Sequence, residues 1–219
     1  TDLVFDSSSG VWLVLLTALY AIDAAQFGHL RAVGMVDSQA VQAGEWWRLF
    51  TAIMLHADLA HLAANLTTGF LLLGLAMGTL GAGLGMLGAY LAGVCGNAAG
   101  LFVYANPHRG LGASGMVLGA LGLLTAQSIV FWRAGGAGKP LVVRGLLGGL
   151  LLLVLLGLSP NPQTDVLAHV TGFLGGLVLG AVIVGLPVRW RQSRWTHRGA
   201  TANGGQTWPG RSVLWPTVV

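Results

Sequence analysis

Apolar runs alternate with short polar segments along the whole of this chain. A helix that crosses the hydrocarbon core of a bilayer needs about 20 mostly apolar residues. Six runs approach or reach that length, at residues 10–26, 57–77, 82–104, 114–132, 142–158 and 166–187. The pattern predicts an all-α, polytopic membrane protein, a bundle of six transmembrane helices that occupies residues 10–187.

Composition supports a membrane protein over a soluble one. Hydrophobic residues make up 54% of the chain, charged residues only 8%, and the mean hydropathy is +0.74. Soluble domains are about 25% charged. The 35 glycines lie largely inside the apolar runs, where small residues let helix backbones approach closely.

The polar segments differ in length. A long loop at 27–55 separates the first two runs, and a tail at 188–219 is rich in Arg, Trp, Pro and Gly. We predict that residues 1–9 form a cytoplasmic N-terminal segment and that the tail is a disordered cytoplasmic extension. The first run follows an acidic stretch, so we expect no cleavable secretion signal.

The placement of Lys and Arg predicts the orientation. Six spans put both termini on one side, and eight basic residues fall there: Arg133, Lys139, Arg144, Arg189, Arg191, Arg194, Arg198 and Arg211. The other side has three, Arg31, Arg48 and Arg109. This predicts cytoplasmic termini and assigns the net charge of +4 to topology, so we expect no nucleic-acid partner. Ten Arg against one Lys is typical of a GC-rich bacterial genome and favours a bacterial inner membrane.

Polar residues are costly within a membrane and mark function by default. Gly112-Ala113-Ser114-Gly115 begins the fourth run. The glycines permit a tight loop, and the N–H of Ser114 at a helix start is a donor that can bind an oxyanion. The alternative is that Ser114 simply caps the helix.

The sixth run contains His169, followed by Gly172, Gly176 and Gly180. At about 100° per residue these four positions share one helix face. His169 should therefore point toward the neighbour against which the glycines pack. The alternative is a packing stripe with an incidental histidine.

The second run contains Asp58, His61 and Asn65 near its start, and His56 directly precedes it. His61 and Asn65 are four apart, so they share a face, and both can donate hydrogen bonds to a developing oxyanion. The alternative is a polar helix start whose side chains cap the helix or bind water. Asp58 is a favourable charge at a helix N-terminus.

Two further features concern metals and the first loop. The spacing of His56 and His61 is not that of a zinc-ligand motif, so we predict no metal and no cofactor, and the single cysteine, Cys95, is best explained as a small buried residue. Trp47 and Arg48 lie in the first loop, where an aromatic anchor at the membrane interface is a simpler interpretation than catalysis.

Taken together, these residues provide a nucleophile, a base and oxyanion donors, the parts that acyl transfer needs. In their order and intervals they resemble the rhomboid family of intramembrane serine proteases, over about residues 10–187. The features that match are Trp47, Arg48, His56, His61, Asn65, Gly112, Ser114, Gly115, His169, Gly172, Gly176 and Gly180.

The resemblance implies a six-helix fold with a water-filled cavity, and a Ser–His dyad without a catalytic Asp. Ser114 is then the nucleophile and His169 the general base, while His61, Asn65 and the Ser114 amide form the oxyanion hole and His56 is structural. The implied substrates are single-pass or other transmembrane proteins within the lipid bilayer.

Two positions depart from the family pattern. Many relatives have a Tyr four residues after the serine, where this chain has Leu118, and an acidic residue near the position of Met77. We therefore expect His169 to be positioned differently and the loop 27–55 to have a different or weaker anchor.

Three alternatives remain at this point. A catalytically silent rhomboid-like protein that binds membrane clients usually lacks the serine or the histidine. A transporter or channel should spread its polar residues through the full depth of the membrane. A metal-dependent protease using His56, His61 and His169 should be inhibited by chelators.

Overall fold

The computed structural model describes residues 4–105, 107–133 and 165–185, together with residues 143, 147, 150, 151 and 154. The chain divides into two compact units, Thr1–Gly185 and Leu186–Val219, and the helices and strands below belong to the first. Most of the predicted fifth span at 142–158 and all of the tail at 188–219 lie outside the described residues. The number of six spans, the domain bounds and the state of the tail therefore stay predictions.

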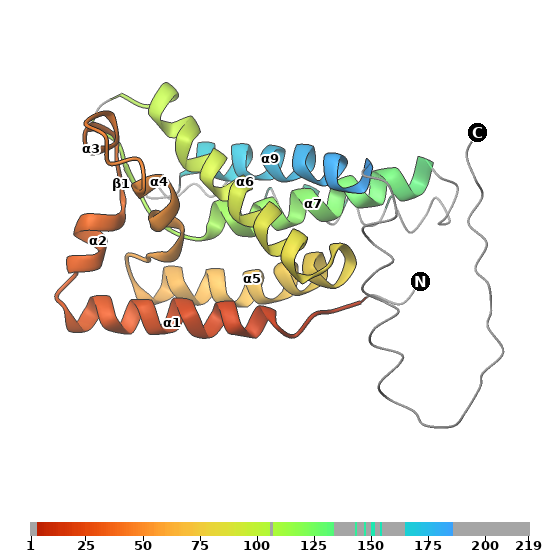
Figure 1. Ribbon diagram of the computed structural model, residues 1–219, viewed down its shortest axis with the longest axis horizontal. Helices are drawn as coiled ribbons and strands as arrows, with labels where there is room; N and C mark the ends of the chain where they lie inside the picture. Colours follow the sequence, from red (N-terminus) through yellow and green to blue (C-terminus); the bar gives the residue numbers. More distant parts are fainter. Residues whose placement is uncertain are drawn as a thin grey trace. The chain divides into compact units, whose positions relative to one another are not determined.

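Five long apolar helices correspond to the other predicted runs. They are α1 (Ser9–Ala25), α5 (Leu59–Leu80), α6 (Ala82–Val103), α7 (Ser114–Arg133) and α9 (Val166–Gly185). Among the described residues, α5, α6 and α9 are long and apolar enough to cross a membrane, while α1 and Ser114–Val130 of α7 are shorter apolar helices. In Figure 1, the axes of α1, α5, α7 and α9 are roughly parallel, with α1 running opposite to the other three, and α6 crosses them obliquely.

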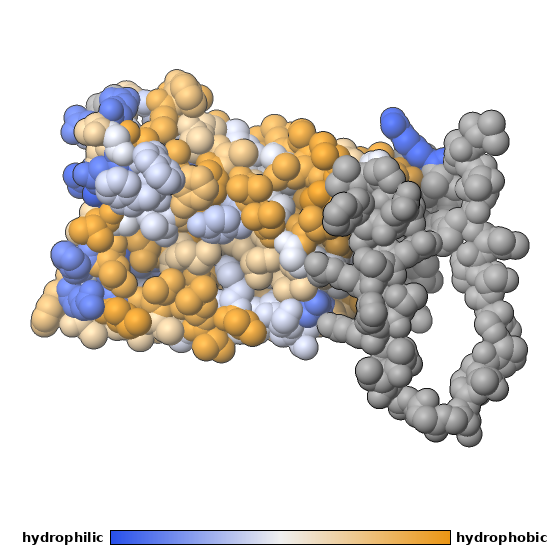
Figure 2. Space-filling view, viewed as in Figure 1, coloured by the Kyte–Doolittle hydropathy of each residue, from blue (hydrophilic) through white to orange (hydrophobic). Residues whose placement is uncertain are grey.

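The surface of this bundle is itself apolar. Large hydrophobic side chains are exposed on several helices, among them Val14 on α1, Leu87 on α6 and Val178 on α9. Figure 2 shows apolar residues over the middle of the helices and hydrophilic residues gathered at the end where α2 and α3 lie. Contact of such a surface with water is unfavourable, whereas contact with lipid tails is not. The protein is therefore an integral membrane protein.

The segment predicted only as a long loop at 27–55 contains regular structure. It forms α2 (His29–Gly34), β1 (Val36–Asp37), α3 (Ser38–Gln42), α4 (Arg48–Thr51) and the 3-10 helix η1 (Ala52–Met54). β1 pairs antiparallel with β2 (Arg109–Gly110), Val36 opposite Gly110 and Asp37 opposite Arg109. This small ribbon is a departure from a strictly all-α fold, and it joins the first loop to the segment that leads into Ser114.

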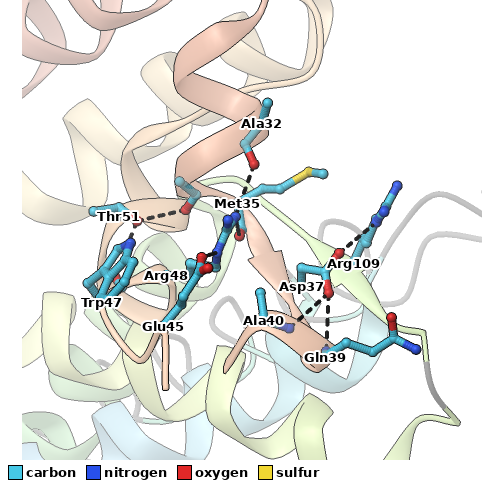
Figure 3. A network of polar contacts seen from close by, with 11 residues as sticks. Ala32, Met35, Asp37, Gln39, Ala40, Glu45, Trp47, Arg48, Thr51 and Arg109 are labelled. Carbon is cyan, nitrogen blue, oxygen red and sulfur yellow. Dashed lines mark hydrogen bonds and ion pairs between the residues drawn. The ribbon is translucent and has the colours of Figure 1, made fainter. Parts of the chain in front are cut away.

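Arg48 is a central anchor of the first loop (Figure 3). Its guanidinium donates to Glu45 Oε2 at 2.6 Å and to the carbonyl oxygens of Ala32 and Met35 at 3.0 and 3.1 Å. Asp37 caps α3 and pairs with Arg109 Nε at 3.0 Å. These contacts fold the loop upon itself because backbone carbonyls that α2 leaves open find a partner in Arg48.

Helix α6 fastens the same loop to the bundle. Asn97 Nδ2 donates to the carbonyl of Leu49 at 2.7 Å, and Tyr90 Oη donates to that of Phe50 at 3.1 Å. Met77, where the family pattern has an acidic residue, is buried in the core. The anchors of this loop therefore include Arg48 within it and two polar side chains of α6.

Candidate active site

Ser114 is the first residue of α7, and the turn before it depends on Gly112. Gly112 has a φ of +127°, in the region that L side chains rarely adopt. A Cβ on it would lie 2.6 Å from Cε1 of His61. Ser114 is half-buried, and its amide belongs to the first turn of α7, where N–H groups lack partners within the helix.

His169 lies one turn into α9 and is buried, with 6% of its surface exposed. The helix begins immediately after Asp165, whose Oδ1 accepts from the Ala168 N–H at 2.9 Å. His169 N–H donates to the Asp165 carbonyl at 3.1 Å. The start of α9 is thus closed by an N-cap carboxylate, which fixes the turn that carries the imidazole.

Ser114 and His169 contact each other directly. Nε2 of His169 lies 2.6 Å from Oγ of Ser114, although the two residues come from different helices. The distance is that of a short hydrogen bond in which the hydroxyl can donate to a neutral imidazole nitrogen. The geometry is that of a nucleophile beside its general base.

The glycines of α9 make this contact possible. A Cβ on Gly172 would meet the carbonyl oxygen of Gly115, and one on Gly176 would meet that of Gly119. Gly180 continues the stripe against Leu123 and Ala126 of α7. Because the absence of side chains at these positions lets the backbones of α7 and α9 approach closely, these glycines allow His169 to come within reach of Ser114.

His61 and Asn65 lie on the first two turns of α5. Asp58 caps this helix by accepting from the His61 N–H at 2.8 Å. Asn65 is 4% exposed, and its Nδ2 donates to the carbonyl of His61 at 3.1 Å. An amide nitrogen carries two N–H groups, so this bond uses one of them.

His56 lies just before α5 and is almost fully buried, at 1% exposure. Its ring packs edge-on against that of His61, with centroids 5.2 Å apart. The Ala113 N–H makes a long bond of 3.5 Å to its Nε2. Burial and the neighbouring His61 lower the pKa of His56 from 6.5 to about 4, so the side chain is neutral at physiological pH.

Three further residues singled out in the sequence differ in burial. Arg48 is buried in the first loop, while Trp47 is 44% exposed, as an interfacial side chain would be. Leu118 is buried in the core one turn after Ser114. Within the described ranges, no group of three His, Cys, Asp or Glu side chains comes close enough to hold a metal ion.

Sequence reasoning missed a polar cluster beside the site. Asp165, Tyr104 and His108 converge at the start of α9. Asp165 stands directly before an apolar helical run, which is a signal for an N-cap. The convergence of the other two residues had no local signal, because it depends on where α6 ends.

The starts of α5, α7 and α9 lie toward the end of the bundle where α2–α4 and β1 lie (Figure 1). Three kinds of group therefore come from neighbouring helix starts: a hydroxyl in contact with an imidazole, N–H groups of a first turn, and the polar side chains of His61 and Asn65. Such a set can activate a nucleophile and stabilise a developing negative charge.

Comparison with known proteins points to one family. A sequence model of the Rhomboid domain matches residues 43–186. The chain is 31% identical over 162 residues to rhomboid protease GluP of Bacillus subtilis. The aligned region covers 72% of this chain and 30% of GluP. It is 30% identical over 160 residues to RHOMBOID-like protein 5 of Arabidopsis thaliana. That aligned region covers 71% of this chain and 50% of the relative.

A third relative is matched over more of the chain. RHOMBOID-like protein 1 of Arabidopsis thaliana is 30% identical over 204 residues, which covers 86% of this chain and 48% of that protein. The matched part thus spans half or less of the length of these three curated relatives.

Proposed function

This chain belongs to the rhomboid family, and we propose that it is a serine endopeptidase that cleaves transmembrane segments within the bilayer. In the proposed reaction Ser114 is the nucleophile and His169 is the general base. The family includes named proteases, and the chain is an integral membrane protein whose helices carry polar residues at their starts.

The single observation that carries the proposal is the 2.6 Å contact between Nε2 of His169 and Oγ of Ser114. A serine hydroxyl is a poor nucleophile at neutral pH until a base accepts its proton during attack. His169 takes that proton as Oγ attacks the scissile carbonyl. It then returns the proton to the leaving amine, and water hydrolyses the resulting acyl-enzyme by the same route.

The oxyanion of the tetrahedral intermediate needs donors, and we assign them to the Ser114 N–H, the His61 side chain and the second amide N–H of Asn65. The place of Ser114 at the first position of α7 supports this, since its amide has no carbonyl one turn earlier in that helix. The packing of His61 against Gly112, two residues before the nucleophile, supports it as well.

The proposed substrates are transmembrane proteins. Helices α5 and α9, which carry site residues, also carry exposed apolar side chains, and this supports a substrate that arrives laterally as a transmembrane helix of another protein and partly unwinds near the membrane surface. We place both termini in the cytoplasm and the site near the opposite face, because eight of eleven basic residues fall on the predicted cytoplasmic side. A bacterial inner membrane is the proposed location.

The test is covalent labelling of the purified protein, in detergent or liposomes, with a fluorescent fluorophosphonate. Wild type should be labelled, while Ser114→Ala and His169→Ala should not. Ser128→Ala is a matched control, because Ser128 lies on the same helix and its hydroxyl donates to the carbonyl of Leu124 one turn earlier. Cleavage of a transmembrane substrate should follow the same order of activity.

A well-folded wild type that is not labelled would contradict the proposal. It would favour a silent rhomboid-like protein that binds membrane clients, with Leu118→Tyr as the first variant to test for a gain of labelling. Labelling that persists in Ser114→Ala would likewise end the assignment of the nucleophile.

A further inference from the structure

Asp165 connects three parts of the protein at the start of α9. Its Oδ1 accepts from the Ala168 N–H at 2.9 Å and from the hydroxyl of Tyr104 at 2.9 Å. Its Oδ2 lies 3.5 Å from Nε2 of His108. One carboxylate therefore caps α9 and binds two side chains from outside that helix.

The two partners belong to the segment that leads into Ser114. Tyr104 directly follows α6, and His108 lies in the loop before β2. Their rings lie 4.4 Å apart, tilted by 30°. The backbone of His108 is held in turn by Ser38, which bonds its N–H at 2.9 Å and its carbonyl at 3.0 Å.

The start of α9 is also pressed against α6. A Cβ on Gly96 would lie 2.7 Å from the carbonyl oxygen of Ala168, so the helices touch through backbone at the residue before His169. The carboxylate of Asp165 lies just beyond this contact. The hydroxyl of Tyr104 is protonated at neutral pH, as a tyrosine ordinarily is, and so can donate to Asp165.

The position of His169 makes these contacts matter for catalysis. It is the fourth residue of α9, and the first turn of a helix frays when its N–H groups lose their cap. Fraying would carry the imidazole away from Oγ of Ser114 without unfolding the rest of the helix. The rate then falls with the fraction of time that the two side chains are in contact.

We propose that Asp165, with Tyr104 and His108, is a positioning unit that holds the start of α9, and with it His169, against the segment that carries Ser114. The inference rests on the proposed protease function. The segments that carry Ser114 and His169 are thus linked in two places. The first is the direct contact of the two side chains, and the second is the set of bonds from Asp165 to Tyr104 and His108.

The test compares three variants at the cluster. Asp165→Ala removes every contact of the carboxylate. Asp165→Asn keeps an oxygen for the Ala168 N–H and Tyr104 but loses the charge that faces His108. Tyr104→Phe removes one hydroxyl and keeps the ring contact, and Tyr20→Phe on α1 is its matched control. The readouts are kcat and KM for a transmembrane substrate, with active sites counted by fluorophosphonate labelling, and the thermal unfolding temperature.

We expect Asp165→Ala to lower kcat per labelled site about tenfold, with KM unchanged because the site's outer surfaces remain. The kcat of Asp165→Asn should be close to that of wild type, and the kcat of Tyr104→Phe should lie between those of Asp165→Asn and wild type. The effects of Tyr104→Phe and Asp165→Ala should be less than additive, because both break the same bond. Tyr20→Phe should match wild type.

A wild-type kcat per labelled site in Asp165→Ala, with only a lower unfolding temperature, would overturn the proposal and leave Asp165 a structural cap. If Asp165→Ala does not fold, Tyr104→Phe at the wild-type kcat overturns it instead. Failure of wild type to be labelled at all would count against the protease function rather than against this unit.

Discussion

Gly112 and His61 are in contact so close that no side chain fits between them. A Cβ on Gly112 would lie 2.6 Å from Cε1 and 2.7 Å from Nε2 of the His61 ring, and the φ of Gly112 is +127°. This position therefore requires glycine for two reasons: the positive φ of the backbone, and the lack of room for a Cβ beside the His61 ring. Both bear on the turn that presents Ser114 and on the ring proposed to bind the oxyanion.

Gly112→Ala should abolish most activity. The substitution strains the backbone by about 1–3 kcal/mol and pushes His61 from its place, so the rate of fluorophosphonate labelling should fall sharply. Gly44→Ala is the matched control, because Gly44 also has a positive φ, +107°, but a Cβ added to it would meet nothing within 4 Å. Equal losses in both variants would show that backbone strain alone, and not the contact with His61, accounts for the effect.

Asn65→Ala tests the oxyanion donor. If the second N–H of its amide stabilises the transition state, kcat should fall about 10²–10³-fold, while labelling of a folded protein should persist at a reduced rate. Thr68→Ala is the control, since Thr68 lies on the same helix and its hydroxyl likewise bonds a carbonyl one turn earlier, that of Ala64 at 2.7 Å. Cleavage by Asn65→Ala at the wild-type rate would remove Asn65 from the proposed hole.

Much of the helical framework could be predicted because its signals are local. The run predicted at 82–104 is α6 at Ala82–Val103, and that at 114–132 is α7 at Ser114–Arg133. Hydropathy predicts that the second helix starts at 57, but α5 begins at Leu59 because the carboxylate of Asp58 caps it. A hydropathy profile responds to apolar residues and does not show at which residue an N-cap begins the helix.

The short elements of the first loop could not be predicted in this way. α4 has four residues and β1 has two, too few for a periodic pattern. They are stabilised by hydrogen bonds from residues elsewhere in the chain. Arg48 donates to the carbonyl of Ala32 in α2, and Asn97 donates to the carbonyl of Leu49. A sequence shows a buried arginine or asparagine only as a polar residue in an unexpected place.

In the candidate site, the approach of His169 to Ser114 could be anticipated from the sequence more readily than the contacts that surround it. A single helix face joins His169 to the glycines that let it approach Ser114, and periodicity alone reveals that face. The bond between Tyr104 and Asp165 joins residues far apart in sequence. It follows from the tertiary packing of α6 against α9, which no local pattern encodes.

The stability of the protein should fall as the pH drops through the range in which His56 titrates. Its pKa is about 4 when folded and 6.5 ordinarily, so between these values the unfolded chain binds a proton that the folded chain does not. The stabilisation is present in full above pH 6.5 and is lost as the pH falls toward 4. Thermal unfolding of wild type and His56→Asn, measured from pH 7.5 to 4.5, should show a shallower decline in the variant. Parallel curves would contradict this role of His56.

Gly176→Ala should be among the most damaging single changes on α9. A Cβ there would meet the backbone of Gly119 in α7, 2.7 Å from its carbonyl carbon, and a backbone cannot move aside as a flexible side chain can. The helices must separate, which should lower the unfolding temperature and draw His169 away from Ser114. Gly175→Ala, one residue earlier, is the control, because its Cβ would lie at an ordinary 3.5 Å from Cα of Ala92. That variant should retain activity and match or exceed the wild-type unfolding temperature, since alanine favours a helix over glycine. Equal behaviour of the two variants would mean that close contact between α7 and α9 does not hold the dyad together.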